Sequence, residues 1–300
     1  MKKKILVTVL ILTIVFMFSA VPGFAATKKI TQVAEKDYDY INGSYKLTYT
    51  WENTYNTKGV RTRFDATRYD YSSGKKKEYT YRTNYKYDGG KVKSEIMKEN
   101  GKNKRKYTYT YKKSGKTSQI NYYEYSTKQS KFVKKEYTKF TYSSTKETET
   151  NYNAKGKVLY KFVRTLNSKG RVTKEVGYEG TKKYYTLTYD YYTNGKVKQE
   201  NWKYTDGSTD VYKYNKKGNI TSSVATMEDM ILKTVYKYND YDLVSKEIDT
   251  SDYGDGDIEK TTTTYSYSNY YNSNHKYPKT TVMKIDGEKI CKYVRTFKKI

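Results

Sequence analysis

The sequence predicts an all-β protein: an extended antiparallel meander of tyrosine-rich β-hairpins that forms one large twisted or curled single-layer sheet. Forty of the 300 residues are tyrosines, and many alternate with polar residues, as in Lys106–Tyr111. Turn signals recur about every 8 to 14 residues from Ser44 onward, the spacing typical of consecutive short strands. No stripe with the 3.6-residue period of a helix follows residue 25. We therefore expect tyrosine to form the core.

Residues 1–25 have the features of a secretory leader. Lys2, Lys3 and Lys4 precede an apolar run from Ile5 to Phe18, and Ala25 ends a cleavage site of small residues. The alternative is an uncleaved membrane anchor, which the short apolar run disfavours. We expect the leader to be removed and the mature chain to have no transmembrane span. The protein is then secreted and extracellular, or bound noncovalently to the cell wall.

Two regions follow the leader. Residues 26–43 are polar, and we expect them to form a flexible N-terminal lead-in to a β-hairpin repeat domain at residues 44–300. Within Tyr214–Ile220, Asn215 suits the first position of a type I turn, and Gly218 suits the left-handed position that follows. Glycine is favoured there because it adopts positive φ without steric cost. We assign this structural turn role to Gly59, Gly90, Gly115, Gly156, Gly170, Gly195, Gly218 and Asp242.

Tighter two-residue turns alternate with these, as at Asn100-Gly101 and Asp206-Gly207. Strands joined by such short loops are antiparallel neighbours, so the chain predicts a meander of roughly 17 to 20 strands. A flat sheet of that width is unusual, and we expect it to curl into a superhelical ribbon or shell. An outer-membrane barrel is the alternative, which the lack of a continuous aliphatic band disfavours. An open sheet leaves edge strands near Ser44 and Ile300, where a protein partner can pair.

The formal net charge is +27, and it is +24 without the three leader lysines. This charge indicates attraction to an anionic cell-wall polymer or glycan. Intracellular nucleic acid is not an expected partner, because the chain is exported. An alternative role for the lysines is to prevent association between strand edges. Tyrosines interleaved with lysines also suit glycan binding, but cross-strand packing among the tyrosines is the preferred explanation.

Three segments, Tyr87–Val92, Tyr191–Val197 and Tyr214–Ile220, share a Tyr, a Gly, then a basic or polar residue and an aliphatic one. They resemble the YD repeats of RHS-type secreted bacterial proteins. The resemblance implies strips of β-hairpins that spiral into a shell, together with export. This chain departs from the family because Asp seldom follows the Tyr, and because no C-terminal domain is present to act as a toxin.

The sequence offers little for catalysis, and we predict no enzyme activity and no cofactor. The single histidine, His275, is expected to be an exposed turn residue, and the single cysteine, Cys291, a small apolar filler of the last strand. Asp252, Asp255 and Asp257 are weak candidates for binding calcium, and an ordinary hairpin turn is the preferred interpretation. We expect a non-enzymatic envelope-associated protein. The alternatives are a structural spacer, scaffold or protein-interaction repeat, and a carbohydrate-active hydrolase with an unrecognised carboxylate pair.

Overall fold

The computed structural model describes residues 30–299, except 74 and 274. The predicted leader, residues 1–25, lies outside the described residues. The strands are β1 (Ile30–Ile41), β2 (Ser44–Tyr55), β3 (Arg61–Asp70), β4 (Lys77–Asp88), β5 (Lys91–Glu99), β6 (Lys102–Tyr111), β7 (Thr117–Ser126), β8 (Lys131–Tyr142), β9 (Lys146–Asn153), β10 (Val158–Leu166), β11 (Val172–Glu179), β12 (Lys182–Tyr191), β13 (Val197–Tyr204), β14 (Thr209–Tyr214), β15 (Ile220–Met227), β16 (Met230–Tyr238), β17 (Val244–Asp252), β18 (Ile258–Tyr270), β19 (Pro278–Ile285) and β20 (Glu288–Lys299).

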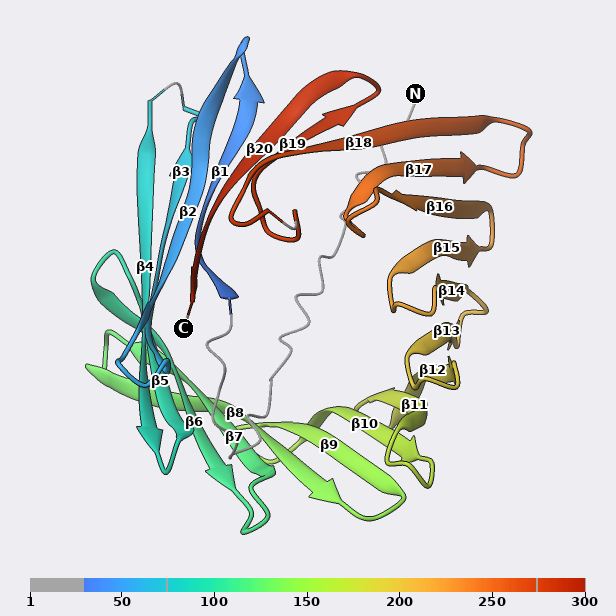
Figure 1. The fold of residues 1–300 in the computed structure, drawn as a ribbon. Helices are drawn as coiled ribbons and strands as arrows, with labels where there is room; N and C mark the ends of the chain where they lie inside the picture. Colours follow the sequence, from blue (N-terminus) through green and yellow to red (C-terminus); the bar gives the residue numbers. More distant parts are fainter. Residues whose placement is uncertain (1–29, 74, 274, 300) are drawn as a thin grey trace.

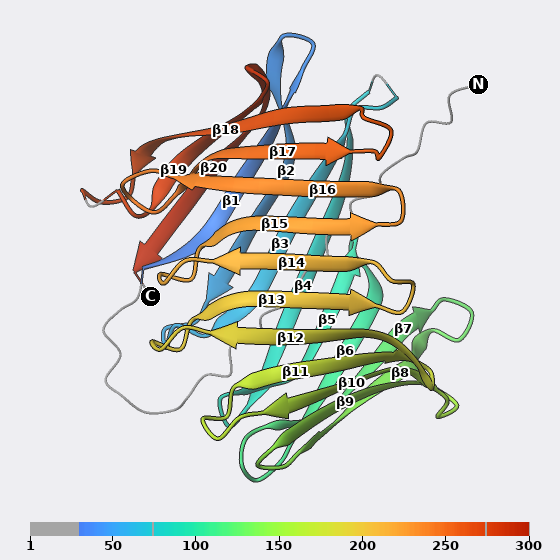
Figure 2. The ribbon, with the colours of Figure 1, turned by 90° about the vertical axis from the view of Figure 1, so that its right-hand side faces the viewer.

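The strands form one 20-stranded antiparallel sheet in which each strand pairs with the next along the chain. Figure 2 shows β12 to β18 stacked in sequence order along one wall. β20 also pairs with β1, and the sheet therefore closes into a barrel (Figure 1). The predicted all-β, antiparallel class is confirmed. The expected open, curled sheet with two free edges is wrong, because pairing of β1 with β20 satisfies both edges.

β1 lies in the segment 26–43, which we expected to be a flexible lead-in. Its Val33 is 2% exposed. Glu35 joins the two neighbouring strands, since its carboxylate accepts a hydrogen bond from Trp51 Nε1 on β2 at 3.3 Å and forms a 2.5 Å ion pair with Arg295 Nε on β20. Glu35, one of the charged residues of this segment, thus links β1 to both neighbouring strands.

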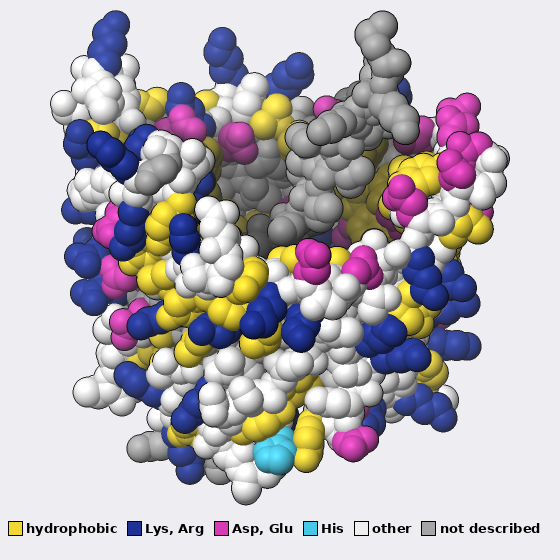
Figure 3. Space-filling model, turned by 90° about the horizontal axis from the view of Figure 1, so that it is seen from above, with side chains coloured by type: hydrophobic (Ala, Val, Ile, Leu, Met, Phe, Trp, Pro, Cys, Tyr) yellow, Lys and Arg dark blue, Asp and Glu magenta, His cyan; other side chains and the backbone are white. Residues whose placement is uncertain are grey.

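Successive residues of a strand point to opposite sides of the barrel wall, which gives a luminal face and an outer face. In β4, Tyr79, Tyr81 and Tyr85 are half-buried on the luminal face, whereas Thr80 and Arg82 are exposed on the outer face. Figure 3 shows Lys and Arg side chains projecting around the outside of the molecule. In β4 the barrel therefore separates the two residue types, with tyrosine facing inward, whereas elsewhere some tyrosines lie on the outer face beside lysine, as Tyr137 does beside Lys139.

The turns have the geometry that their sequences predict. In the β14–β15 turn, Gly218 N donates to Asn215 O at 2.9 Å, and the Asn215 side chain accepts from Lys217 N and Asn219 N. The φ angle of Gly218 is 91°. Positive φ occurs at every residue to which we assigned the turn role: Gly59, Gly90, Gly115, Gly156, Gly170, Gly195, Gly218 and Asp242.

The tyrosine at the end of many strands ties its hairpin to the preceding one. Tyr191, at the end of β12, donates its hydroxyl to Val172 O at the start of β11, at 2.5 Å. Four further hydroxyls make the same bond, with distances of 2.5 to 2.7 Å: Tyr87 to Arg61 O, Tyr111 to Val92 O, Tyr238 to Ile220 O and Tyr267 to Val244 O. These bonds give the tyrosine near the end of several strands a physical reason.

Few side chains are fully buried, because the wall is one layer thick. The tightest packing is the β10–β12 cluster, where Leu187 is 1% and Tyr185 8% exposed. The Tyr185 ring covers Gly177 on the adjacent strand, and a Cβ at Gly177 would lie 2.2 Å from that ring. Tyr185 Oη donates to Glu175 at 2.5 Å, and Glu175 also pairs with Arg164 at 2.5 Å. Within the described residues, no helix is long and apolar enough to cross a membrane.

Candidate functional site

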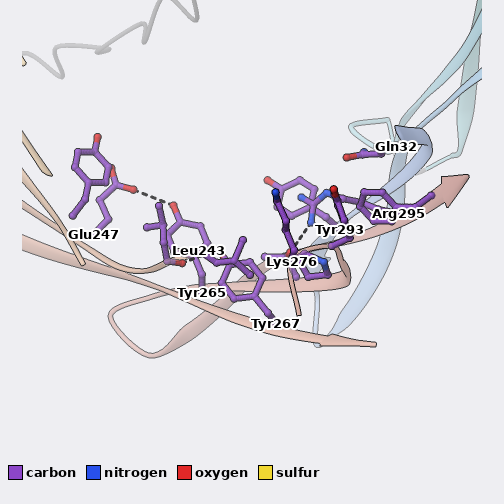
Figure 4. Close-up of a pocket in the computed structure, with 14 residues that line it drawn as sticks. Gln32, Leu243, Glu247, Tyr265, Tyr267, Lys276, Tyr293 and Arg295 are labelled. Carbon is purple, nitrogen blue, oxygen red and sulfur yellow. Dashed lines mark hydrogen bonds between the residues drawn. The ribbon is translucent and has the colours of Figure 1, made fainter. Parts of the chain in front are cut away.

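A hollow lies on the luminal face where β16–β20 meet β1, and we call it the luminal hollow. Its volume is about 510 Å³. Figure 4 shows its side chains on the concave side of the sheet. Tyrosine is the most frequent residue of its lining, which includes Tyr236, Glu247, Tyr265, Tyr267, Tyr293 and Arg295.

Strand register brings these side chains together. Tyr236 on β16 is directly opposite Glu247 on β17. Tyr265 on β18 donates its hydroxyl to Glu247 Oε2 at 3.0 Å (Figure 4). On the other side, Arg295 Nη1 donates to Thr281 Oγ1 at 2.6 Å. The hollow therefore has a carboxylate at one end and a guanidinium at the other, with aromatic rings between them.

Burial is the largest cause of the pKa shifts of Glu247 and Tyr236 in the hollow. It raises the pKa of Glu247, against the opposing effect of the Tyr265 hydrogen bond. Burial also raises the pKa of Tyr236 to about 12, and the neighbouring Glu247 carboxylate adds to this shift. Tyr236 is thus a neutral hydrogen-bonding group at neutral pH.

Pairs of a tyrosine and a carboxylate recur around the lumen. They include Tyr109 with Glu95 at 2.8 Å, Tyr204 with Asp210 at 2.9 Å and Tyr214 with Glu200 at 3.1 Å. Our sequence reasoning paired the tyrosines with lysine and missed these carboxylates. The signal was present: in β13, Glu200 shares the two-residue period of Trp202 and Tyr204, whereas Lys203 is out of phase with them.

Asp37 lies on β1 at the seam, and its Oδ1 atom is buried without a hydrogen-bond partner among the described residues. Burial raises the pKa of Asp37 to about 6, with a further contribution from Glu35 that outweighs the opposing effect of Arg295. In the unfolded chain this carboxyl ionises near pH 4. The folded state holds its proton to higher pH, so the contribution to stability that is present below about pH 4 is lost as pH rises to about 6.

We therefore expect Asp37→Asn to stabilise the barrel more at pH 7 than at pH 4. Denaturant unfolding at both pH values measures the effect. Asp240→Asn, at an exposed turn residue, is the control and is expected to change stability by a similar small amount at both. An Asp37→Asn effect that does not depend on pH would contradict the assignment.

The outer face of β16–β20 carries four lysines in a row, which we call the outer lysine row. Lys237 is directly opposite Lys246, and Lys284 is directly opposite Lys289. Thr264 on β18 joins the two pairs. Strands are about 4.8 Å apart, so the four charges lie within about 20 Å along the wall. Within the described residues, none of the four forms an ion pair.

The three aspartates that the sequence offers as weak calcium candidates lie away from the luminal hollow and the outer lysine row. Asp252, Asp255 and Asp257 are in the β17–β18 turn, where Asp252 accepts from Gly254 N and Asp255 from Asp257 N, as in ordinary turns. Among the described residues, no group of three or more His, Cys, Asp and Glu side chains is arranged to hold a metal. His275 lies between the rings of Tyr241 and Tyr270, and Cys291 is buried in β20 as a free thiol.

No protein-family model matches the sequence, and no curated protein matches it. Among solved structures, a porin-like protein from Bacteroides uniformis is 13% identical over 73% of this chain and 95% of its own, with a TM-score of 0.38. A porin-like protein from Bacteroides vulgatus is 11% identical over 90% of this chain and 100% of its own, with a TM-score of 0.33. A DUF3836 family protein from Bacteroides vulgatus is 18% identical over 31% of this chain and 87% of its own, with a TM-score of 0.23. At this level of similarity, none of them indicates what this chain binds.

The resemblance to YD repeats is wrong. The sheet closes through β1 and β20 instead of continuing as an open strip. The segments Tyr87–Val92, Tyr191–Val197 and Tyr214–Ile220 form the β4–β5, β12–β13 and β14–β15 turns. A Tyr followed by a left-handed Gly meets the requirements of hairpin turns in general, so this motif does not identify one architecture.

Proposed function

We propose that the protein is an exported, non-enzymatic component of the bacterial envelope that binds anionic polymers through the outer lysine row. The observation that carries the proposal is the direct opposition of Lys237 with Lys246 and of Lys284 with Lys289. Like charges directly opposite each other on a sheet destabilise it. A row of anionic groups along the wall would relieve this repulsion, and would bind more strongly to the row than to scattered lysines.

Closure of the barrel argues against the alternative role of the lysines, which is to prevent association between strand edges. Protection by lysine is needed at free strand edges, and β16–β20 lie within a continuous ring of paired strands. Edge protection therefore does not explain this row. Lysines on a lipid-facing wall cost about 2–4 kcal/mol each at the bilayer midplane, which favours an outer face in contact with water and polyanions.

Retention on purified Gram-positive cell walls, with and without teichoic acid, tests the proposal over a salt series. We expect binding that requires teichoic acid and is lost by about 0.5 M salt, where charges are screened beyond a few ångströms. Replacing Lys237, Lys246, Lys284 and Lys289 by Gln is expected to weaken binding at least about tenfold and to reduce its salt dependence.

The matched control replaces Lys93, Lys104, Lys116 and Lys135 by Gln. It removes the same charge, but each of these lysines already pairs with a carboxylate of the barrel. We expect it to weaken binding much less. Equal losses in the two variants would show that net charge alone attracts the polymer. No retention of the unmodified protein would favour a structural spacer or scaffold.

A further inference from the structure

The luminal hollow has the size and the lining of a small-molecule site. Ligand sites in proteins typically enclose about 300–1,000 Å³, and this one measures about 510 Å³. Such a volume has room for a ligand of roughly disaccharide size. The hollow lies on the opposite face of the strands that carry the outer lysine row, so it is a separate site.

Four tyrosines of the hollow lie outside the aromatic clusters of the barrel, whereas Tyr277, which also lines it, contacts Phe297. Tyr107 stacks on Tyr122, and Tyr185 packs against Trp202. Tyr236, Tyr265, Tyr267 and Tyr293, in contrast, have no ring–ring contact within the described part of the chain. Ring–ring packing of the kind found in those clusters therefore does not occupy the faces of these four rings.

The polar groups of the hollow supply both kinds of hydrogen-bonding partner. The Glu247 carboxylate, which accepts from Tyr265 through Oε2, has several lone pairs, and the hydroxyl oxygen of Tyr265 is itself an acceptor. Gln32 and Arg295 supply donors at the opposite end (Figure 4). The Arg295 charge is balanced by Glu35 in a 2.5 Å ion pair.

This combination discriminates between classes of ligand. An anion would meet Glu247, and a cation would meet Arg295 and Lys276, which both line the hollow. A neutral molecule with many hydroxyl groups can donate to the carboxylate and accept from the guanidinium and amide. Its rings present C–H faces that pack on tyrosine. We propose that the luminal hollow binds a neutral saccharide of one or two rings.

Titration calorimetry of the full barrel tests this with three disaccharides as probes: maltose, cellobiose and N,N′-diacetylchitobiose. They distinguish an α-glucan, a β-glucan and an amino-sugar polymer as the source of the ligand. We expect at least one to bind. Glu247→Gln and Tyr293→Leu are expected to weaken that binding about tenfold, the loss of a hydrogen bond to a charged group or of a ring contact.

The matched control is Glu95→Gln, because Glu95 accepts from Tyr109 in the same kind of luminal pair but does not line the hollow. It is expected to leave saccharide affinity unchanged. Saturation-transfer NMR on the unmodified protein gives a readout that does not depend on how the variants fold. No binding of any probe, or equal loss in Glu95→Gln, overturns the proposal. Neither result affects the wall-binding proposal, since the outer lysine row is intact in every variant.

Discussion

A chain that begins at Ser44 is expected to lose the closed barrel and to self-associate, whereas a chain that begins at Ile30 folds as the full protein does. β1 pairs along most of its length with both β2 and β20. Its removal exposes two long strand edges, and it also removes the anchoring contacts of Glu35 with Trp51 and Arg295. Exposed edges of this length pair with other copies.

The remaining strands cannot repair the gap by the same pairing. β2 and β20 are both antiparallel to β1, so they run parallel to each other. An odd number of strands in a meander cannot close with antiparallel pairs alone. Size-exclusion chromatography with light scattering, and binding of an amyloid dye, compare the chains that begin at Ser44 and Ile30. A chain from Ser44 with the same mass per particle and the same unfolding midpoint would show that β1 is dispensable.

Gly177→Val is expected to be among the most destabilising single substitutions, by about 3 kcal/mol or more, as for overpacking of a tight core. The Tyr185 ring occupies the space that a side chain at position 177 would need. Displacing that ring also breaks its hydrogen bond to Glu175, a carboxylate that is 8% exposed. Both the packing and the polar network of the β10–β12 cluster depend on this glycine.

Tyr185→Phe separates the two contributions, because it keeps the ring and removes only the hydroxyl. Glu175 retains its ion pair with Arg164, so we expect a smaller loss of about 1–2 kcal/mol. Denaturant unfolding of the two single variants and the double variant gives the coupling between the sites. A cost below about 0.5 kcal/mol for Gly177→Val, the range of an ordinary surface change, would contradict the packing described above.

Local structure was largely predictable from the sequence. The alternation in β4 and the Asn215–Gly218 turn are determined by neighbouring residues, and each has a steric or periodic signature. Closure was not predictable, because it depends on one pairing between Ile30–Ile41 and Glu288–Lys299 across almost the whole chain. β1 contains Glu35, Lys36, Asp37 and Asp39, and its charges look unfavourable for a strand until the partner strand is known.

The luminal hollow shows the same limit. The two-residue period could have placed Glu200 on the same face as the tyrosines of its strand, and it could have assigned a face of β17 to Glu247. It could not have brought Glu247 and Arg295 to one hollow, because their proximity depends on how β17 and β20 curve within the closed wall. The tyrosine that precedes a turn was recognised as a pattern, but its hydrogen bond to the preceding hairpin, as from Tyr191 to Val172, required coordinates.

The pairing of Ile30 with Lys299 brings the two ends of the described chain side by side. The described backbone is therefore a ring that is open at one place, between the start of β1 and the end of β20. Every strand has the same relation to its two neighbours, and the β1–β20 seam differs from the other junctions only in having no turn. The ends of the chain could equally lie at another hairpin, as in a circular permutant, and whole hairpins could be gained or lost in pairs of strands without leaving an unpaired edge.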